Sequence, residues 1–395
     1  MSLGFRTRDL PPLTAEEAGR VCAMIERLGL LRETEGPLYF DRYMECVLYD
    51  PSLGYYRQGQ SPIGTAGDFV TLPETTPLFG ETLSRMFAPL YEAGLERTLV
   101  EIGPGTGRLA GQIAGALARA GTPLDHCILV EPDRGLWPRQ QAFLSTLRGT
   151  EGTPFEWCTN PPPEWSGLLV MNEIVDAFPV ALVEKGGSGW FEWGVRVRAG
   201  RLIFEPLTLR APVRHALEEI EEALGPLAAG YRTECNPTLG TRLGAILSGC
   251  ANGCALVVDY GYSRRHYYHP DRRMGTLQCY FRQLVHEDPL HAPGVEDLTA
   301  MVDFTALAQA AVDAGFELAG YAPLAPFLLA AGLVGAENSG RPNRADGVEH
   351  TRWVREVLRL TDPHETGELF KVMMFAKGAV PDVAAFASCD QSDRL

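Results

Sequence analysis

The 395-residue sequence has little of several features that would assign it to a specialised class of protein. Its nine cysteines form no CxxC pair, and their odd number and irregular spacing favour free thiols over a disulfide framework or a zinc site. The N-terminus carries no hydrophobic signal-peptide region, and no later stretch reaches the length of a membrane span. We therefore expect a cytoplasmic protein that has no membrane partner.

Positive charge is also scarce. The chain has 35 basic and 50 acidic residues, a formal net charge of −15, and no stripe of lysine or arginine. Because proteins that bind a phosphate backbone need clustered cations, the composition argues against nucleic acid as a partner. A cationic substrate is compatible with such an acidic chain.

The sequence does contain a regular alternation of short apolar runs and helical segments, which begins at Leu99. The predicted strands are residues 99–102, 126–132, 155–158, 167–173, 254–262 and 368–378, and the predicted helices are 108–121, 139–147 and 303–315. Fully apolar short strands separated by helices are typical of a parallel sheet that is covered on both faces. The pattern therefore predicts an α/β fold with a Rossmann-like, mostly parallel sheet.

Segments outside this alternation suggest additional parts. A helix is predicted over 14–31, where Thr14 and Glu17 form a capping box, and another over 78–94. Between 180 and 253 the pattern changes to a hairpin around Ala199–Gly200 and a helix over 212–224. The predicted organisation is an N-terminal helical cap (1–95), a core (96–180 and 250–380), an inserted α+β substrate-covering subdomain (181–249) and a frayed tail (381–395).

The strongest local motif is VEIGPGTGRL, which follows the first predicted strand and opens a helix. Its glycines are Gly103, Gly105 and Gly107. Glycines let a ligand approach the backbone, and the amides of a helix start face it. The third glycine of a dinucleotide fingerprint would fall where Arg108 stands, which argues against an NAD dehydrogenase. A G-x-G-x-G run two residues after Glu101 instead indicates S-adenosylmethionine, whose ammonium group Glu101 can help to orient.

Glu131 ends the second predicted strand. An acid at this place in such a sheet accepts hydrogen bonds from ribose hydroxyls, so it supports an adenosine ligand of either kind.

A second polar group follows the fourth predicted strand. Asn172 lies at the strand end, and Glu173 and Asp176 are expected to share one face of a helix that starts there. Ligands of open α/β sheets bind at the carboxyl ends of the strands, so these side chains should face the acceptor. Such carboxylates can hold a guanidinium or ammonium group, or take a proton. In the alternative interpretation, Asn172 and Asp176 only cap a helix. Asp259 ends the fifth strand and adds another carboxylate.

Residues 263–298 are unusually rich in histidine. They contain His266, His269, His286 and His291, in a chain with eight histidines. Metal binding is one interpretation, but the spacing matches no helical histidine pair. We therefore favour a loop that covers the substrate, with no metal.

Motifs along most of residues 40–375 resemble the MidA-type family, which includes the mitochondrial complex I assembly arginine methyltransferase. The matching segments are 48–56, 67–81, 100–109, 172–180, 257–262, 275–290, 297–307 and 367–375. The resemblance implies a Rossmann methyltransferase core, S-adenosyl-L-methionine as the cofactor and an added substrate-covering subdomain.

The resemblance also implies roles for particular residues. The residues implied to bind the cofactor are Glu101, Gly103, Gly105, Thr106, Gly107 and Glu131, with Gly67, Asp68 and Thr71 closing over it. Asn172, Glu173 and Asp176 are implied to face the acceptor. The sequence departs from the family pattern at Gln278, Tyr280–Gln283, Met301 and Ala325, where polar groups expected on the acceptor side are changed. These departures indicate a changed acceptor or a lost activity.

Two functions from different classes follow. The first is a methyltransferase in which a nucleophile attacks the sulfonium methyl group in line and a carboxylate takes a proton. Its partner would be a protein, with arginine as the acceptor, or a small metabolite; a second copy in a homodimer is compatible. The alternative is a non-catalytic relative that binds the cofactor or a partner during assembly of a protein complex.

Overall fold

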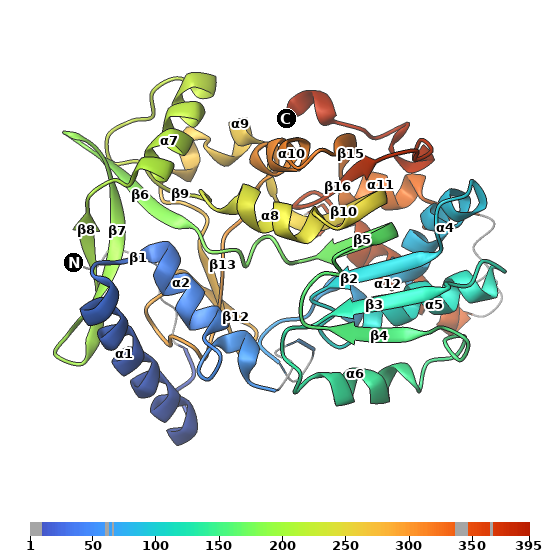
Figure 1. Ribbon diagram of the computed structural model, residues 1–395, viewed down its shortest axis with the longest axis horizontal. Coiled ribbons are helices and arrows are strands. Elements are labelled where there is room, and N and C mark those ends of the chain that lie inside the picture. Colours follow the sequence, from blue (N-terminus) through green and yellow to red (C-terminus); the bar gives the residue numbers. More distant parts are fainter. Residues whose placement is uncertain (1–9, 60–62, 65–66, 336–346, 364–365) are drawn as a thin grey trace. The chain divides into compact units, whose positions relative to one another are not determined.

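The computed structural model describes residues 10–59, 63–64, 67–335, 347–363 and 366–395, which fall into two compact units (Figure 1). Unit 1 comprises Met1–Phe69, Asp176–Leu239 and Arg264–Val302, and unit 2 comprises Val70–Val175, Gly240–Ser263 and Asp303–Leu395. This grouping differs from the boundaries expected from the sequence. Residues 70–95 belong with the core, and residues 264–302 join the N-terminal segment and most of the insertion.

Unit 2 is built on a mixed sheet with the strand order β15-β16-β10-β5-β2-β3-β4 (Figure 1). These strands are β2 (Thr98–Ile102), β3 (His126–Val130), β4 (Phe155–Cys158), β5 (Trp165–Asn172), β10 (Cys250–Tyr262), β15 (Glu317–Pro323) and β16 (Phe370–Lys377). Pairing is parallel from β4 to β10, whereas β16 runs antiparallel to both β10 and β15. The predicted α/β class with a mostly parallel sheet is confirmed, and the antiparallel edge is an addition to it.

Helices cover this sheet. They are α3 (Leu72–Thr75), α4 (Leu78–Glu92), α5 (Arg108–Arg119), α6 (Trp137–Leu144), α8 (Leu239–Leu247), α10 (Phe304–Asp313), α11 (Leu324–Ala330) and α12 (Gly347–Thr361). Alternate strand residues such as Leu99, Leu168 and Leu256 join one hydrophobic cluster with side chains of α4, α5, α11 and α12. Because strand side chains alternate between faces, this cluster is the core on one side of the sheet.

The predicted frayed tail is wrong. Two 3₁₀ turns, η3 (Ala384–Phe386) and η4 (Ser392–Arg394), follow β16. Phe386 is buried, with its ring centroid 5.0 Å from that of Phe327. The Asp390 carboxylate accepts the backbone N–H of Tyr321 at 2.9 Å. The tail is therefore part of the core of unit 2.

Unit 1 contains a five-stranded antiparallel sheet with the order β1-β7-β6-β9, in which β8 pairs with β7. Its strands are β1 (Leu38–Tyr39), β6 (Ala181–Gly186), β7 (Gly189–Arg198), β8 (Arg201–Leu207) and β9 (Arg232–Cys235). Its helices are α1 (Ala15–Glu35), α2 (Phe40–Tyr49), α7 (Ala211–Leu224) and α9 (Arg264–Tyr267), with 3₁₀ turns η1 (Tyr55–Arg57) and η2 (Pro270–Arg272). The predicted capping box of α1 and the β7–β8 hairpin are confirmed.

A second, three-stranded sheet in unit 1 has the order β12-β11-β13. It consists of β11 (Gln278–Phe281), β12 (Leu284–His286) and β13 (Asp297–Thr299). The short strand β14 (Val302–Asp303) is not part of it and pairs with β10. Arg282 and Gln283 join β11 to β12 with positive φ angles of 49° and 63°. The histidine-rich region that was expected to be a loop is thus partly a folded sheet.

Among the described residues, no helix combines the length and the apolar character needed to cross a membrane.

Candidate active site

The glycine motif forms a turn between β2 and α5, as predicted. Gly103, Gly105 and Gly107 have positive φ angles of 63°, 55° and 82°, in the region that favours glycine. The Gly103 N–H donates to the carbonyl of Val130 on the neighbouring strand at 3.0 Å. A turn in which every second residue lacks a side chain therefore leads directly into the N-terminus of α5, an arrangement that fits an amino-acid or phosphate ligand.

Glu101 lies beneath this turn. Its carboxylate accepts the backbone N–H of Ala110, in the first turn of α5, at 3.0 Å, and the residue is 4% exposed. Burial raises the pKa of the Glu101 carboxyl to about 8. The side chain thus fastens β2 to α5, a role that the sequence did not indicate.

Glu131 follows β3 and is held by a polar network. One carboxylate oxygen accepts the Asp133 N–H at 2.8 Å, and the other accepts the side-chain amide of Gln140 at 3.3 Å. The same amide donates to the carbonyl of Gly105 at 2.9 Å, and the Trp157 indole donates to the Gln140 oxygen at 2.8 Å. Gln140 therefore connects the predicted ribose carboxylate to the glycine turn. The sequence analysis did not identify Gln140, although a glutamine on the apolar side of a helix can indicate a buried polar contact.

Helix α3 is fixed to the start of α5 by Glu74. The Thr106 hydroxyl donates to one Glu74 oxygen, and the Arg108 side chain donates to the other at 2.8 Å. Thr71 is the residue before α3 and is buried. Glu74 thus attaches the short helix that follows Thr71 to the end of the glycine turn.

Asn172 and Glu173 lie at the carboxyl end of β5. This strand runs beside β2, with Met171 opposite Ile102. Glu173 has a positive φ of 54°, and its carboxylate accepts the Asn172 amide at 3.1 Å and the Leu72 N–H at 3.4 Å. The side-chain oxygen of Asn172 is buried and has no hydrogen-bond partner within the described part of the chain. A polar pair is therefore placed at the edge of the sheet that carries the glycine turn.

The predicted helix after Asn172 is wrong. Residues 173–179 form bends and turns, and Glu173 has a left-handed φ of 54° that an α-helix does not accommodate. The buried Asp259 carboxylate accepts the N–H groups of Ile174 at 3.2 Å and Val175 at 2.9 Å, which satisfies the backbone of this turn. Glu173 and Asp176 consequently do not share a helix face.

Asp176 belongs to unit 1, where it is buried near Asp297. The Tyr56 hydroxyl donates to Asp297 at 2.7 Å, and the Tyr49 and Tyr56 rings stack with centroids 5.6 Å apart. Burial, with the negative charge of Asp176, raises the pKa of Asp297 to about 8. Carboxylates beside aromatic rings form an environment suited to a cation.

Gly67 and Asp68 also belong to unit 1. The Asp68 carboxylate accepts the Tyr55 hydroxyl at 2.9 Å and the Arg282 N–H at 2.6 Å, while its carbonyl accepts the Gln283 N–H at 2.9 Å. Asp68 therefore holds the β11–β12 turn. The role of Gly67 and Asp68 beside the cofactor stays a prediction.

Comparison with known proteins identifies the chemistry. Residues 80–322 match a family model that describes S-adenosyl-L-methionine-dependent methyltransferases. The chain is 29% identical over 321 residues to mitochondrial protein arginine methyltransferase NDUFAF7 of Mus musculus, covering 74% of this chain and 70% of the relative. It is 30% identical over 294 residues to the Caenorhabditis elegans homolog, covering 68% and 67%.

A solved structure is similar over nearly the whole chain. The solved structure is that of a Burkholderia thailandensis protein crystallised with S-adenosylhomocysteine bound. Its sequence is 35% identical to the present chain, and the two structures superpose with a TM-score of 0.91. The match covers 98% of the present chain and 100% of the Burkholderia chain. The family resemblance inferred from the sequence motifs is therefore confirmed, as is the predicted cofactor. The chain belongs to the family of S-adenosyl-L-methionine-dependent methyltransferases, with a methyl acceptor as its second substrate.

Proposed function

We propose that the enzyme methylates a guanidinium nitrogen of an arginine in a partner protein, and that Asn172 and Glu173 receive this group. The observation that carries the proposal is the polar pair after β5. Asn172 presents a buried side-chain oxygen without a hydrogen-bond partner among the described residues, next to the Glu173 carboxylate. Buried acceptors require donors, and a guanidinium offers five N–H groups in a planar fork.

Two further observations support a cationic acceptor. The relatives from Mus musculus and Caenorhabditis elegans are named protein arginine methyltransferases. Within unit 1, the buried carboxylates of Asp176 and Asp297 and the ring of Tyr56 also form surroundings suited to a cation. A protein arginine is therefore preferred over a small metabolite.

We assign the cofactor to residues of unit 2. The assigned residues are Glu101, Gly103, Gly105, Thr106, Gly107 and Glu131, with Thr71 beside them. The turn amides receive the amino-acid end, and the Glu131 carboxylate accepts the ribose hydroxyls.

When bound, S-adenosylmethionine supplies an electrophilic methyl carbon, and its sulfur takes the electron pair of the broken carbon–sulfur bond. Glu173 orients the acceptor nitrogen and takes the proton which that nitrogen loses on methylation. Asn172 fixes the plane of the guanidinium through its side-chain oxygen. Orientation contributes the larger part of the rate, since a properly held nucleophile needs little further activation.

The test is methyl transfer from labelled cofactor to an extract that is then divided into protein and small-molecule fractions. We expect label in protein and, after hydrolysis, in methylarginine. Glu173→Gln should lower kcat by about 10²- to 10⁴-fold and leave the cofactor Kd within about twofold, because Glu173 is assigned to the acceptor. Glu317→Gln, at an exposed residue of β15, is the matched control and should retain full activity.

Label confined to the small-molecule fraction would replace arginine with a metabolite as the acceptor. Unchanged activity in Glu173→Gln would remove the assigned role of this carboxylate. If neither fraction is labelled although the cofactor binds, the chain is a non-catalytic relative.

A further inference from the structure

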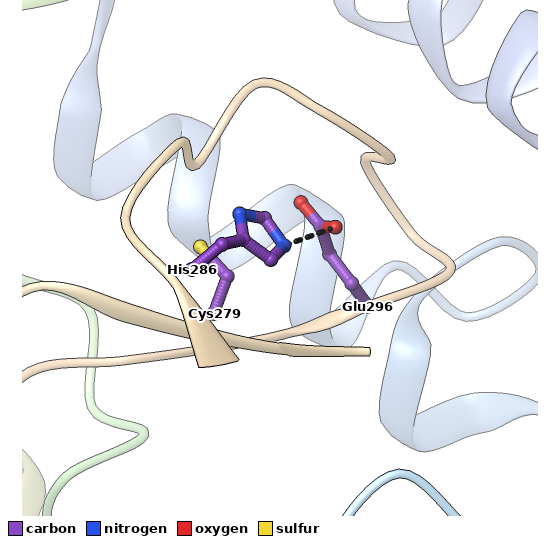
Figure 2. A group of neighbouring side chains, drawn as sticks. All are labelled: Cys279, His286 and Glu296. Atoms are coloured by element: carbon purple, nitrogen blue, oxygen red, sulfur yellow. Dashed lines mark hydrogen bonds and ion pairs between the residues drawn. The ribbon is translucent and has the colours of Figure 1, made fainter. Parts of the chain in front are cut away.

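Four potential metal ligands of unit 1 lie together in the β11–β12–β13 sheet and the segment between β12 and β13. The ligand atoms of Cys279, His286 and Glu296 all lie within 4.8 Å of one another, and all three residues are buried (Figure 2). His286 Nε2 is 3.0 Å from a Glu296 carboxylate oxygen. His291 Nδ1 is 2.9 Å from the same oxygen, so His291 is the fourth member.

The backbone explains why these side chains converge. Cys279 and His286 are directly opposite each other in the antiparallel β11–β12 pair, so they project from the same face of the sheet. Glu296 immediately precedes β13, which pairs with β11 on its other side and sets Leu298 opposite Cys279. The donors therefore come from one small sheet whose register is fixed by backbone hydrogen bonds.

The surroundings hold the group in place. The Ala292 N–H donates to the second Glu296 oxygen at 3.1 Å, and the Tyr43 hydroxyl donates to the carbonyl of Pro289 in the same segment. Cys279 also belongs to the main hydrophobic cluster of unit 1. Ligands held by packing and outer hydrogen bonds are a condition for a well-defined metal site.

The hydrogen bonds described above join the two histidines to the glutamate, and they do not involve the Cys279 thiol. Cys279 is a free cysteine and is fully buried. The carboxyl groups of Glu296, Asp288 and Glu287 make its neighbourhood negative. A dication would offset this accumulation of negative charge.

The donor set matches zinc. One thiolate, two imidazoles and one carboxylate are all ligands of Zn²⁺, and bond lengths of about 2.0–2.3 Å place the donors of a tetrahedral site about 3.2–3.8 Å apart. The ligand atoms of Cys279, His286 and Glu296 lie within 4.8 Å of one another, and the His286 and His291 nitrogens lie 3.0 and 2.9 Å from the Glu296 oxygen, so small side-chain shifts would bring these donors to the spacing of a site. A thiolate and a carboxylate would neutralise the ion, which suits a buried site.

We propose that Cys279, His286, His291 and Glu296 form a structural Zn²⁺ site that fastens the β11–β12 hairpin to the segment before β13. The His291 side chain is 28% exposed and provides the path by which the ion enters. The site holds four protein ligands and keeps no open position, so its role is structural rather than catalytic.

The test uses the full chain, free of any tag that binds metal, after removal of metals with a chelator. Titration with Co²⁺ should give one ion per chain, a visible spectrum with the intensity of tetrahedral coordination, and a near-ultraviolet thiolate-to-cobalt charge-transfer band. Zn²⁺ should displace the cobalt and raise Tm relative to the chelated protein, because it binds only the folded chain.

Cys279→Ser should abolish the charge-transfer band and weaken Zn²⁺ binding by about 100-fold or more, since even the loss of groups that only orient ligands costs 10- to 100-fold. Cys46→Ala is the matched control, because Cys46 is a buried free cysteine of the same hydrophobic cluster outside the donor group. It should bind cobalt as the unsubstituted chain does.

The proposal is overturned if the unsubstituted chain binds no stoichiometric cobalt, or binds it without a thiolate band. It is also overturned if Cys279→Ser keeps the affinity of the unsubstituted chain. Should Cys279→Ser fail to fold, the spectrum of the unsubstituted chain and the zinc affinity of Glu296→Gln decide the question. None of these readouts depends on methyl transfer, so a failure here is distinct from a failure of the proposed activity.

Discussion

Gly103 is the first glycine of the turn between β2 and α5, to which we assign the cofactor. Its φ is +63°, and a Cβ atom added there would lie 2.4 Å from the Ile174 side chain. The backbone conformation therefore favours glycine, and a larger residue would also have to displace the end of the Ile174 side chain. Ile174 follows Glu173, so the same contact relates the turn to the proposed acceptor pair.

We predict that Gly103→Ala destabilises the protein by about 1–3 kcal/mol and weakens cofactor binding by tenfold or more. Urea unfolding and calorimetric titration with S-adenosylmethionine measure the two effects. Gly19→Ala is the control: Gly19 lies inside α1 with no atom within 4 Å of the added Cβ. The free energy of unfolding of that variant should rise by about 0.5–1 kcal/mol. An equal loss of stability in Gly103→Ala and Gly19→Ala would contradict the special requirement for glycine at position 103.

Glu101 should make stability depend on pH. Its pKa is about 8 in the folded chain against 4.5 for an unperturbed carboxyl, so the folded chain retains a proton that the unfolded chain loses between these values. Stability should therefore fall as the pH rises from about 4.5 to about 8, by up to about 1.4 kcal/mol per pH unit. Unfolding in urea at several pH values, without cofactor, measures this slope.

Glu101→Gln keeps an oxygen for the Ala110 N–H but cannot ionise. Its free energy of unfolding should be closer to that of the unsubstituted chain at pH 5 than at pH 8. At pH 8 the variant should be the more stable of the two, because only the unsubstituted chain loses stability on ionisation of Glu101. Parallel pH profiles for the two proteins would show that Glu101 is not the titrating group.

At the scale of elements, the C-terminal 3₁₀ turns differ most from the prediction, because the sequence was expected to end in a frayed tail. Phe386 packs on Phe327 and lies so close to Gly320 of β15 that a Cβ there would be 2.3 Å from its ring. We predict that Phe386→Ala costs about 3–5 kcal/mol, measured by urea unfolding. Leu358→Ala, at a 59% exposed position of α12, should change stability by less than about 0.5 kcal/mol. If Phe386→Ala lowered the free energy of unfolding only slightly, the C-terminal tail would not be part of the hydrophobic core.

The elements that could be predicted from sequence are those with a strong local pattern. The strands around the glycine turn, α5 and the β7–β8 hairpin are examples, since apolar runs and turn residues define them. The helix expected after Asn172 is wrong because Glu173 has a left-handed φ of 54°, and Asp259, far along the chain, satisfies the amides of the turn that follows. Strand β15 was missed because its sequence, ELAGYAP, contains glycine, proline and alanine, which are uncommon in strands. The strand also lies at the end of the sheet, where it pairs only with β16.

Contacts between residues distant in sequence also limited the prediction of the candidate site. Glu101, the three glycines and Glu131 stand in a motif or at a strand end, so the local sequence was enough to make them candidates. Gln140 and Glu74 contribute through contacts with distant residues, and no spacing rule reports such contacts. The β1–β7 pairing of Leu38 with Val195 is equally non-local, which is why the division into units could not be predicted.

At the scale of the whole molecule, the net charge of −15 should influence which acceptors are methylated. If the acceptor is a basic protein segment, attraction should raise its rate of association, and salt should screen the attraction. We predict that kcat/KM for an arginine-containing basic peptide falls several-fold between about 0.05 and about 0.5 M salt. The KM for the cofactor should change by less than about twofold, and a salt-independent peptide rate would contradict an electrostatic contribution.

The chain passes from one unit to the other five times. Neither unit is therefore a continuous stretch that a ribosome could release and fold before the rest emerges. During synthesis β10 must wait for β16, so one edge of a long apolar strand stays open until β16 has emerged. Nascent chains of this enzyme should consequently depend on chaperones, and premature stop codons should yield aggregates rather than working fragments.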